Sequence, residues 1–521
     1  MPDRLRPPAV VARVAAGAVA RVLSGLVCGL VARLIPRMAG AAAALLPALA
    51  CAPAAASSLP PEVRAVLQRA GVPESAFGAI ALPLNGLART WQHRADEPMQ
   101  PGSTMKLLTS IVALERLGPG LRGRTELLGT GPVEGGVLRG DLVLRGGADV
   151  ELGWPQLLGL LNELREQGVR EIAGDLLLDR TLFSPARPDL GVPDFDDAPE
   201  WPYNVIPDAL NLAGSLLGIE LRADASTLQV RSQPALQGLE FDTRGMVLTQ
   251  ARCADWDDTW ERPGLREEGT RVVVVLRGAF PRDCTARAEL QLMDRNRLAG
   301  LGFATLWSRL GGSWSGTARE APTPAGARLL ARRESRPWGE ILRGLNKRSD
   351  NAQTRLLYQL LGVNAAGADA RTPTLERAAG AVRGWLDEQG IGHDGVVLDN
   401  GSGLSRSERI RPRQLAHALR AALAGRHASE LLMSLPVAGV DGTMRNRLRD
   451  SPAAGWARLK TGTLRNVRAL AGVVPDATGR TWVLVAFVNH EQAARASPAL
   501  DALVDWVARG QPQPGREPVA P

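Results

Sequence analysis

Hydrophobic positions along this chain change their spacing several times, and each change marks a change of predicted structure. Apolar residues three or four apart predict helices, whereas short apolar runs and alternation predict strands. A helix is predicted at 60–71, followed by two strands at 76–84 and 87–93 with a turn at Asn85-Gly86. After the break at Pro101-Gly102, helical spacing returns from 103 to 117. The start of the chain is therefore predicted to mix helices and strands.

The block from 121 to 289 has a different pattern. Glycine-rich turns separate short apolar stretches, and one helix is predicted at 154–167. The predicted strands are 137–145, 174–178, 228–231 and 272–276. The pattern favours a β-rich inserted region that consists of one domain or of a pair of domains.

Helical spacing dominates again from residue 290. Helices are predicted at 294–310, from 351 onward, at 375–389, 412–423 and 498–507, and strands at 468–474 and 481–489. The resulting hypothesis is an α/β (α+β) catalytic domain made of two segments, 57–120 and 290–510, from which 121–289 is looped out. The proline-rich tail 511–521 is predicted to be flexible.

The first 56 residues differ in composition from the rest. Six arginines precede an alanine-rich apolar run, and Ala54 and Ala56 form a small-x-small pattern before Ser57. This predicts an export signal with a long basic leader, cleaved near Ala56, and a periplasmic protein. A later start codon, a membrane anchor and lipidation at Cys51 are the alternatives. Prolines interrupt the run, so it offers no uninterrupted span of ~20 apolar residues for an anchor.

Two cysteines follow the leader, Cys253 and Cys284. An even pair in an oxidising compartment predicts a disulfide, and two buried free thiols are the alternative.

Charge and composition exclude some functions. The net charge is +8, but six of the arginines lie in the leader, and no stripe of basic and aromatic residues predicts nucleic-acid binding. No spacing of metal ligands is visible, so neither a metal nor a cofactor is predicted.

Lysine is nearly absent. Only three of the 62 Lys and Arg residues are lysines: Lys106, Lys347 and Lys460. Arginine cannot lose its proton in a protein, and its planar fork does not fit a site built for a compact ammonium. The three lysines therefore indicate places where chemistry requires an amine.

The first lysine lies three residues after a serine at the start of the predicted helix 103–117. This spacing puts Ser103 and Lys106 on one helix face. A lysine whose pKa is depressed by burial and nearby positive charge can take the proton of a serine nucleophile. A capping serine beside a solvated lysine is the structural alternative.

The second lysine, Lys347, precedes Ser349-Asp350-Asn351. These residue types are also preferred at helix N-caps, which is the structural alternative. In the functional interpretation Ser349 relays a proton to the leaving group and Asn351 hydrogen-bonds Lys106 or the substrate. The sequence assigns no role to Lys347 beyond a surface charge.

The third lysine begins Lys460-Thr461-Gly462-Thr463, after a predicted edge strand. A peptide can add to such an edge through main-chain hydrogen bonds. Lys460 and Thr461 are predicted to hold a terminal carboxylate, and Gly462 to leave room for substrate. The N–H groups of Ser103 and Thr463 are predicted to form an oxyanion hole. An ordinary strand and turn is the alternative.

The joint occurrence of these three motifs favours one shared site, because together they account for all three lysines. No histidine accompanies them, which disfavours a Ser-His-Asp hydrolase.

The chain after the leader resembles the D-alanyl-D-alanine carboxypeptidase/endopeptidase family of class C low-molecular-mass penicillin-binding proteins, the penicillin-binding protein 4 type (peptidase family S13). The 246 positions between Ser103 and Ser349 are typical of that family. Further matching segments are 101–107, 140–149, 399–405, 435–443 and 460–464.

The resemblance implies a penicilloyl-serine transferase (β-lactamase/transpeptidase-like) fold with an insert of two small domains. It implies a serine peptidase that removes the terminal D-Ala from peptidoglycan stem peptides through an acyl-enzyme on Ser103. It also implies binding of β-lactams and cutting of D-Ala–diaminopimelate cross-links. Two other functions stay open: a β-lactamase, which needs fast deacylation, and a non-catalytic cell-wall protein that binds muropeptides.

Overall fold

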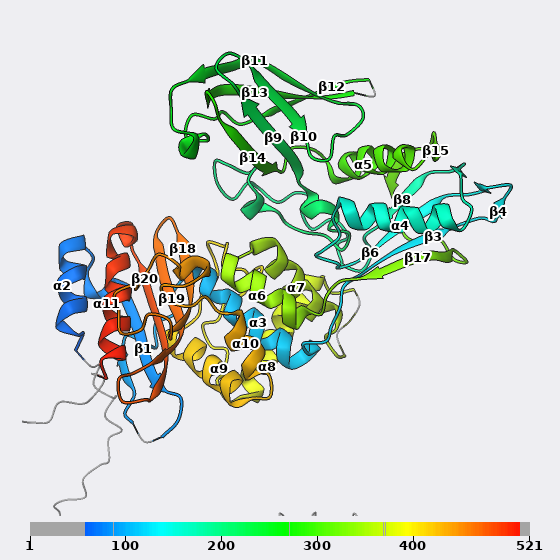
Figure 1. Ribbon diagram of the computed structural model, residues 1–521. Coiled ribbons are helices and arrows are strands. Elements are labelled where there is room, and N and C mark those ends of the chain that lie inside the picture. Colours follow the sequence, from blue (N-terminus) through cyan, green and yellow to red (C-terminus); the bar gives the residue numbers. More distant parts are fainter. Residues whose placement is uncertain (1–57, 87, 270, 368, 370, 511–521) are drawn as a thin grey trace, which may run out of the picture. The chain divides into compact units, whose positions relative to one another are not determined.

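The computed structural model describes residues 58–510, apart from 87, 270, 368 and 370 (Figure 1). The predicted leader 1–56, with its cleavage site and Cys51, and the predicted tail 511–521 lie outside the described residues.

A five-stranded antiparallel sheet contains strands from both ends of the chain (Figure 1). Its order is β18-β19-β20-β1-β2, and β1 pairs with β20 from Phe77↔Val488 to Pro83↔Trp482. The strands are β1 (Phe77–Pro83), β2 (Trp91–His93), β18 (Arg458–Leu464), β19 (Val467–Pro475) and β20 (Thr481–Asn489). This order makes β18 an edge strand, and an isolated antiparallel bridge joins its first residue, Arg458, to Val437.

Helices cover both faces of this sheet. On one face lie α2 (Pro61–Ala70) and α11 (Ser497–Ala508), and on the other lie α3 (Met105–Leu117) and α9 (Pro412–Ala424) (Figure 1). Strand β1 shows why its sequence is apolar throughout. Ala79 and Ala81 pack with the α2 side, whereas Ile80 and Leu82 pack with the α3 side. Successive side chains of a strand point to opposite faces, so a sheet covered on both sides needs a continuous apolar run.

Helix α3 lies within a helical layer and is buried along most of its length. All ten residues from Met105 to Leu114 are buried. Its neighbours are α6 (Trp338–Arg348), α7 (Asn351–Val363), α8 (Thr374–Glu388) and α9, and α10 (Ala428–Ser434) packs on α6 and α9. The burial of α3 on all sides gives Lys106 its dry environment. Helices and sheets together confirm the predicted α+β class.

The strands between 124 and 334 form separate sheets. Their orders are β16-β8-β6-β3-β17, β15-β7-β5-β4, β10-β9-β14 and β11-β13-β12. The elements are β3 (Arg124–Gly129), β4 (Val133–Glu134), β5 (Val137–Leu138), β6 (Leu142–Gly147), α4 (Trp154–Glu166), β7 (Glu171–Ile172), β8 (Leu176–Asp179), β9 (Leu217–Ala223), β10 (Leu228–Ser232), β11 (Leu239–Thr249), β12 (Gly264–Glu268), β13 (Arg271–Pro281), β14 (Thr285–Leu290), α5 (Arg295–Arg309), β15 (Ser313–Trp314), β16 (Ala318–Glu320) and β17 (Arg328–Glu334). The strand predicted at 137–145 is two strands, because the chain turns between β5 and β6.

The packing of α5 bears on where the inserted region ends in the sequence. Phe303 and Trp307 of α5 share a hydrophobic cluster with Leu157 and Leu161 of α4. Strand β17 pairs with β3 in the same five-stranded sheet. We therefore propose that the inserted region extends to Glu334, beyond the boundary predicted at residue 289.

A disulfide joins Cys253 and Cys284, whose Cα atoms are 5.4 Å apart. It links the segment after β11 to the start of β14.

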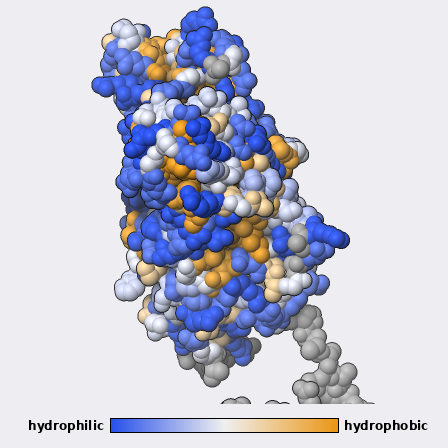
Figure 2. Space-filling view, turned by 90° about the vertical axis from the view of Figure 1, so that its right-hand side faces the viewer, coloured by the Kyte–Doolittle hydropathy of each residue, from blue (hydrophilic) through white to orange (hydrophobic). Residues whose placement is uncertain are grey.

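On the face shown in Figure 2, hydrophilic residues predominate and hydrophobic residues gather in separate patches. Within the described part of the chain, no helix combines the length and the apolar character that crossing a membrane requires.

Candidate active site

The start of α3 places a serine beside a buried lysine. Ser103 lies in a short 3₁₀ helix (Gly102–Thr104) that leads into α3, and its side chain lines a cleft of about 1000 Å³. The Nζ of Lys106 is 3.0 Å from Ser103 Oγ, and the Lys106 side chain is fully buried. The two residues therefore lie on one face of the helix start, with the serine open to the cleft.

Two further groups contact the same amine. Lys106 Nζ donates to Asn351 Oδ1 at 2.6 Å and to the main-chain carbonyl of Ser402 at 2.5 Å. Burial, and after it the nearby Lys460, hold the pKa of Lys106 well below its usual range. A neutral amine has two hydrogens and one lone pair. In that neutral form the two acceptors would take both hydrogens and leave the lone pair for Ser103 Oγ, 3.0 Å away.

A tight turn between two helices presents Ser349 and Asn351. Helix α6 ends at Arg348, Ser349 adopts a left-handed conformation (φ 60°), and α7 begins at Asn351. Asp350 caps α7 by accepting a hydrogen bond from the N–H of Gln353 at 2.9 Å. The helix-cap explanation therefore holds for Asp350, while its two neighbours face the cleft.

Lys460 lies on β18, buried behind Ser349. Its Nζ donates to Ser349 Oγ at 2.8 Å and to the carbonyl of Thr461 at 2.9 Å. Its side chain is fully buried, and burial lowers the pKa of Lys460 to about 7. The hydroxyl of Thr461 donates to that of Thr443 at 2.8 Å, and Thr463 also lines the cleft.

Gly462 has a different surrounding from the one expected. A Cβ on this residue would lie 2.6 Å from the carbonyl oxygen of Pro101 and 3.0 Å from the nitrogen of Ser103. The space that glycine leaves is therefore filled by the nucleophile segment. Glycine at 462 allows edge strand β18 to lie directly against the start of α3.

The loop that supplies the Ser402 carbonyl was assigned no role from the sequence. It folds around Glu408, whose buried carboxylate accepts hydrogen bonds from the N–H of Gly401 at 2.8 Å and of Gly403 at 2.9 Å. Burial raises the pKa of Glu408. Gly403 has φ 81°, and a Cβ there would lie 2.0 Å from the carbonyl oxygen of Gly102. The loop therefore packs closely against the nucleophile segment.

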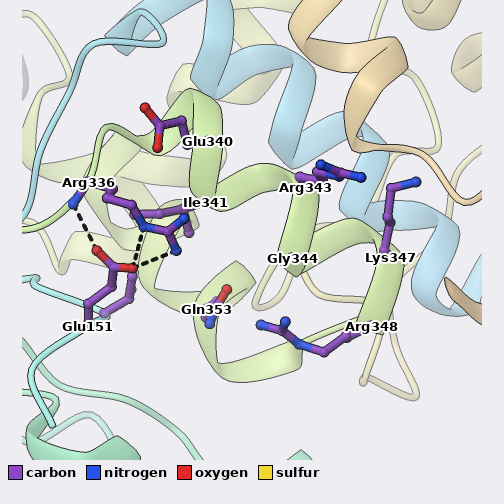
Figure 3. A pocket seen from close by; sticks show the side chains of 10 residues that line it. Glu151, Arg336, Glu340, Ile341, Arg343, Gly344, Lys347, Arg348 and Gln353 are labelled. Carbon is purple, nitrogen blue, oxygen red and sulfur yellow. Dashed lines mark hydrogen bonds and ion pairs between the residues drawn. The ribbon is translucent and has the colours of Figure 1, made fainter. Parts of the chain in front are cut away.

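Lys347 lies outside this cleft. It lines a separate hollow of about 380 Å³ on α6, together with Arg343 and Arg348 (Figure 3). Its Nζ pairs with Asp441 Oδ2 at 2.5 Å, and Asp441 Oδ1 accepts a hydrogen bond from the N–H of Val437. Lys347 thus anchors the loop that carries Thr443. It contacts neither Ser103 nor Ser349, the serines that Lys106 and Lys460 contact.

The eight residues predicted for the site converge on this cleft and its walls. Ser103, Ser349, Asn351, Thr461 and Thr463 line the cleft, Lys106 and Lys460 lie buried behind the two serines, and Gly462 packs on the nucleophile segment. Sequence reasoning missed the Ser402 carbonyl, Glu408, Thr443 and Tyr203. Among the described residues, no group of three or more His, Cys, Asp or Glu side chains is arranged to hold a metal ion.

Comparison with known proteins gives consistent matches. The family model described as the D-Ala-D-Ala carboxypeptidase 3 (S13) family matches residues 59–510. A D-alanyl-D-alanine carboxypeptidase of Actinomadura sp. (strain R39) is 30% identical over 488 residues, 89% of this chain and 86% of the relative. The D-alanyl-D-alanine carboxypeptidase DacB of Haemophilus influenzae is 28% identical over 431 residues, 80% of this chain and 85% of the relative.

Solved structures match the fold. The crystal structure of penicillin binding protein 4 (dacB) from Haemophilus influenzae has a TM-score of 0.69 and 24% identity, covering 85% of this chain and 99% of that one. The same protein complexed with a β-lactam has a TM-score of 0.67 and covers 86% of this chain and 99% of that one.

The fold is therefore the transpeptidase-like fold of penicillin-binding proteins. The chain belongs to the D-Ala-D-Ala carboxypeptidase 3 (S13) family. It is a serine-type D-Ala-D-Ala carboxypeptidase, a hydrolase, which confirms the class predicted from the three motifs.

Proposed function

We propose that this enzyme removes the terminal D-Ala from peptidoglycan stem peptides through an acyl-enzyme on Ser103. The observation that carries the proposal is the environment of Lys106. Its amine is fully buried, its pKa is depressed, and two fixed acceptors direct its lone pair to Ser103 Oγ. A lysine in this state takes a proton from serine at neutral pH.

Acylation then follows from the geometry. Lys106 takes the hydroxyl proton as Ser103 Oγ bonds to the carbonyl carbon of the penultimate D-Ala. The N–H groups of Ser103 and Thr463 hold the negative oxygen of the tetrahedral intermediate. The C–N bond breaks, and the proton reaches the leaving nitrogen by way of Ser349, which Lys460 contacts at 2.8 Å. Lys460 and Thr461 hold the carboxylate of the departing D-Ala.

Deacylation reuses the same groups. Water attacks the acyl carbon, its proton passes to Lys106, and the C–O bond to Ser103 breaks as the serine regains its proton. A β-lactam acylates Ser103 in the same way but keeps its leaving nitrogen attached, which slows the second step. The Haemophilus influenzae relative has been solved with a β-lactam, which supports this part of the proposal.

Digestion of purified muropeptides tests the proposal. A pentapeptide substrate is expected to lose one D-Ala, and mass spectrometry after incubation with a β-lactam is expected to place the adduct on the peptide that contains Ser103. A cross-linked dimer in the same digest measures the endopeptidase activity. Absence of D-Ala release and of an adduct would remove the proposal, whereas rapid loss of the adduct would favour a β-lactamase.

The charge on Lys460 predicts a pH dependence of substrate binding. Because its pKa is lowered to about 7, the free enzyme loses this charge as the pH rises through 7. The KM for a D-Ala-D-Ala peptide is therefore expected to rise about tenfold between pH 6 and pH 8, since each unit above the pKa removes most of the charged form. A substrate whose terminal carboxylate is amidated is the control. A KM that does not change for the free acid would contradict the role of Lys460.

We propose that the enzyme works in the periplasm after removal of the leader. Its substrate class lies there, and the disulfide between Cys253 and Cys284 suits an oxidising compartment. Protein recovered from the periplasmic fraction is expected to begin near Ser57 and to carry both cysteines oxidised. Intact-mass measurement before and after alkylation checks both points, and free thiols in that fraction would contradict the second.

A further inference from the structure

Helix α7 presents a row of polar side chains to the inserted region. Asn351, Arg355 and Gln359 lie four residues apart, so they share one helix face. Each donates to a main-chain carbonyl of the segment 203–207. Asn351 Nδ2 lies 2.9 Å from the Tyr203 oxygen, Arg355 Nη1 lies 2.9 and 2.7 Å from those of Asn204 and Val205, and Gln359 Nε2 lies 3.2 Å from that of Pro207. The three side chains are buried.

Arg355 is the central contact of this row. It is 6% exposed, and burial lowers the pKa of its guanidinium to about 10. Asp399 and Glu408 act on it electrostatically, but it forms no ion pair within the described part of the chain. Burying a guanidinium without a carboxylate is costly, and the hydrogen bonds to these two carbonyls offset part of that cost.

The first contact of the row reaches the reacting groups. The amide of Asn351 donates from Nδ2 to the Tyr203 carbonyl and accepts at Oδ1 from Lys106 Nζ. If the amide were flipped, its NH₂ would face the lysine amine and its oxygen would face a carbonyl, and both contacts would be lost. The Tyr203 carbonyl therefore fixes which end of Asn351 faces Lys106.

We infer that the inserted region is a working part of the catalytic site, with Arg355 as a positioning residue. Arg355 holds the segment 203–205, the Tyr203 carbonyl orients the amide of Asn351, and that amide directs the amine of Lys106 at Ser103. This inference rests on the proposed function, because it assumes that Lys106 activates Ser103.

A double-mutant cycle tests the inference. Arg355→Met is expected to lower the acylation rate constant for a β-lactam by roughly 10–100-fold, since small displacements of aligned groups have effects of that size. In an Asn351→Ala background the same change is expected to matter less than about threefold, because the amide to be oriented is gone. A merely structural role would give the same loss in both backgrounds.

Two further variants distinguish the orientation of the Asn351 amide from two other effects: loss of the charge of Arg355, and a general loosening of the inserted region. Arg355→Lys keeps a charge that also influences the pKa of Lys106 and can still donate to one carbonyl, so an intermediate loss is expected. It carries the test if Arg355→Met does not fold. Arg336→Met is the matched control. Arg336 also links the inserted region to the α6 side, through Glu151 (Figure 3), but it is 62% exposed and does not contact Asn351.

The outcomes are distinct. Loss of acylation that depends on Asn351, with Arg336→Met near wild type, supports the inference. Equal losses in both backgrounds, or wild-type acylation in both Arg355 variants, would overturn it. If the wild-type enzyme itself forms no acyl-enzyme, the proposed function fails instead. Rates are compared on the high-pH plateau, where differences in the pKa of Lys106 no longer contribute, and thermal unfolding confirms that each variant is folded.

Discussion

Ser103→Ala is expected to slow D-Ala release by roughly 10⁴-fold or more, because no other group takes over the covalent step when the nucleophile of such a unit is removed. Ser103 is the serine hydroxyl that lies 3.0 Å from the buried amine of Lys106 and also lines the cleft. Binding of substrate is expected to survive, since Lys460, Thr461 and the edge of β18 are untouched. Release of D-Ala from a pentapeptide and labelling by a fluorescent penicillin measure the covalent step, and equilibrium binding of the pentapeptide to the variant measures substrate binding.

The matched control is Ser349→Ala, which removes the other serine of the cleft. Ser349 accepts from Lys460 and is proposed to relay a proton, so the variant is expected to be slow but still to form a covalent adduct. Ser103→Ala is expected to form none. A stable penicillin adduct on Ser103→Ala would show that the nucleophile is a different residue.

Much of the fold is readable from spacing. The strand predicted at 76–84 and the helix after Ser103 appear near their predicted bounds, because the sheet is covered on both faces and local apolar runs dominate there. The strand predicted at 87–93 is shorter in the structure, where β2 begins at Trp91. Helix α6 was missed, although Trp338, Ile341, Leu342 and Leu345 have helical spacing and are buried. Its glycine and charged residues obscured the pattern.

For the candidate site, the side-chain groups could be predicted from the sequence and the main-chain contacts could not. Side-chain chemistry was visible, since Ser103, Lys106, Ser349, Asn351 and Lys460 were identified from residue type and rarity. Contacts made by the main chain were not visible, because any residue has a carbonyl. The Ser402 carbonyl, which contacts Lys106, and the Tyr203 carbonyl, which contacts Asn351, belong to segments far from their partners in sequence, and only the fold brings them together. Lys347 shows where residue rarity misleads. The scarcity of lysine indicated a chemical role for it, whereas in the structure it forms an ion pair with Asp441.

The role of Lys106 is open to a second, stricter test. Lys106→Arg and Lys106→Met are each expected to reduce acylation by roughly 10²–10⁴-fold, the usual contribution of a positioned general base. Arginine keeps the positive charge but cannot give up its proton, and methionine has a similar length but no amine. Both therefore remove the same lone pair by different means. Stopped-flow acylation by a chromogenic β-lactam measures the loss.

Stability is the control that this pair needs, because Lys106 is fully buried. Met at 106 leaves Asn351 Oδ1 and the Ser402 carbonyl without a donor, which costs about 1–3 kcal/mol for each unsatisfied group. Arg at 106 would bury a permanent charge and is expected to lower the melting temperature further. Lys347→Arg, which keeps the ion pair with Asp441, is expected to acylate within about twofold of wild type.

A double substitution tests whether Lys106 acts as a general base or has a structural role. If Lys106 acts only by taking the proton of Ser103, then Ser103→Ala/Lys106→Met has no proton to transfer and is expected to be no slower than Ser103→Ala alone. A further loss in the double variant would mean that Lys106 also stabilises the transition state in another way. Near-normal acylation by a folded Lys106→Met enzyme would remove it as the base and leave Lys460, with its pKa of about 7, as the amine to test next.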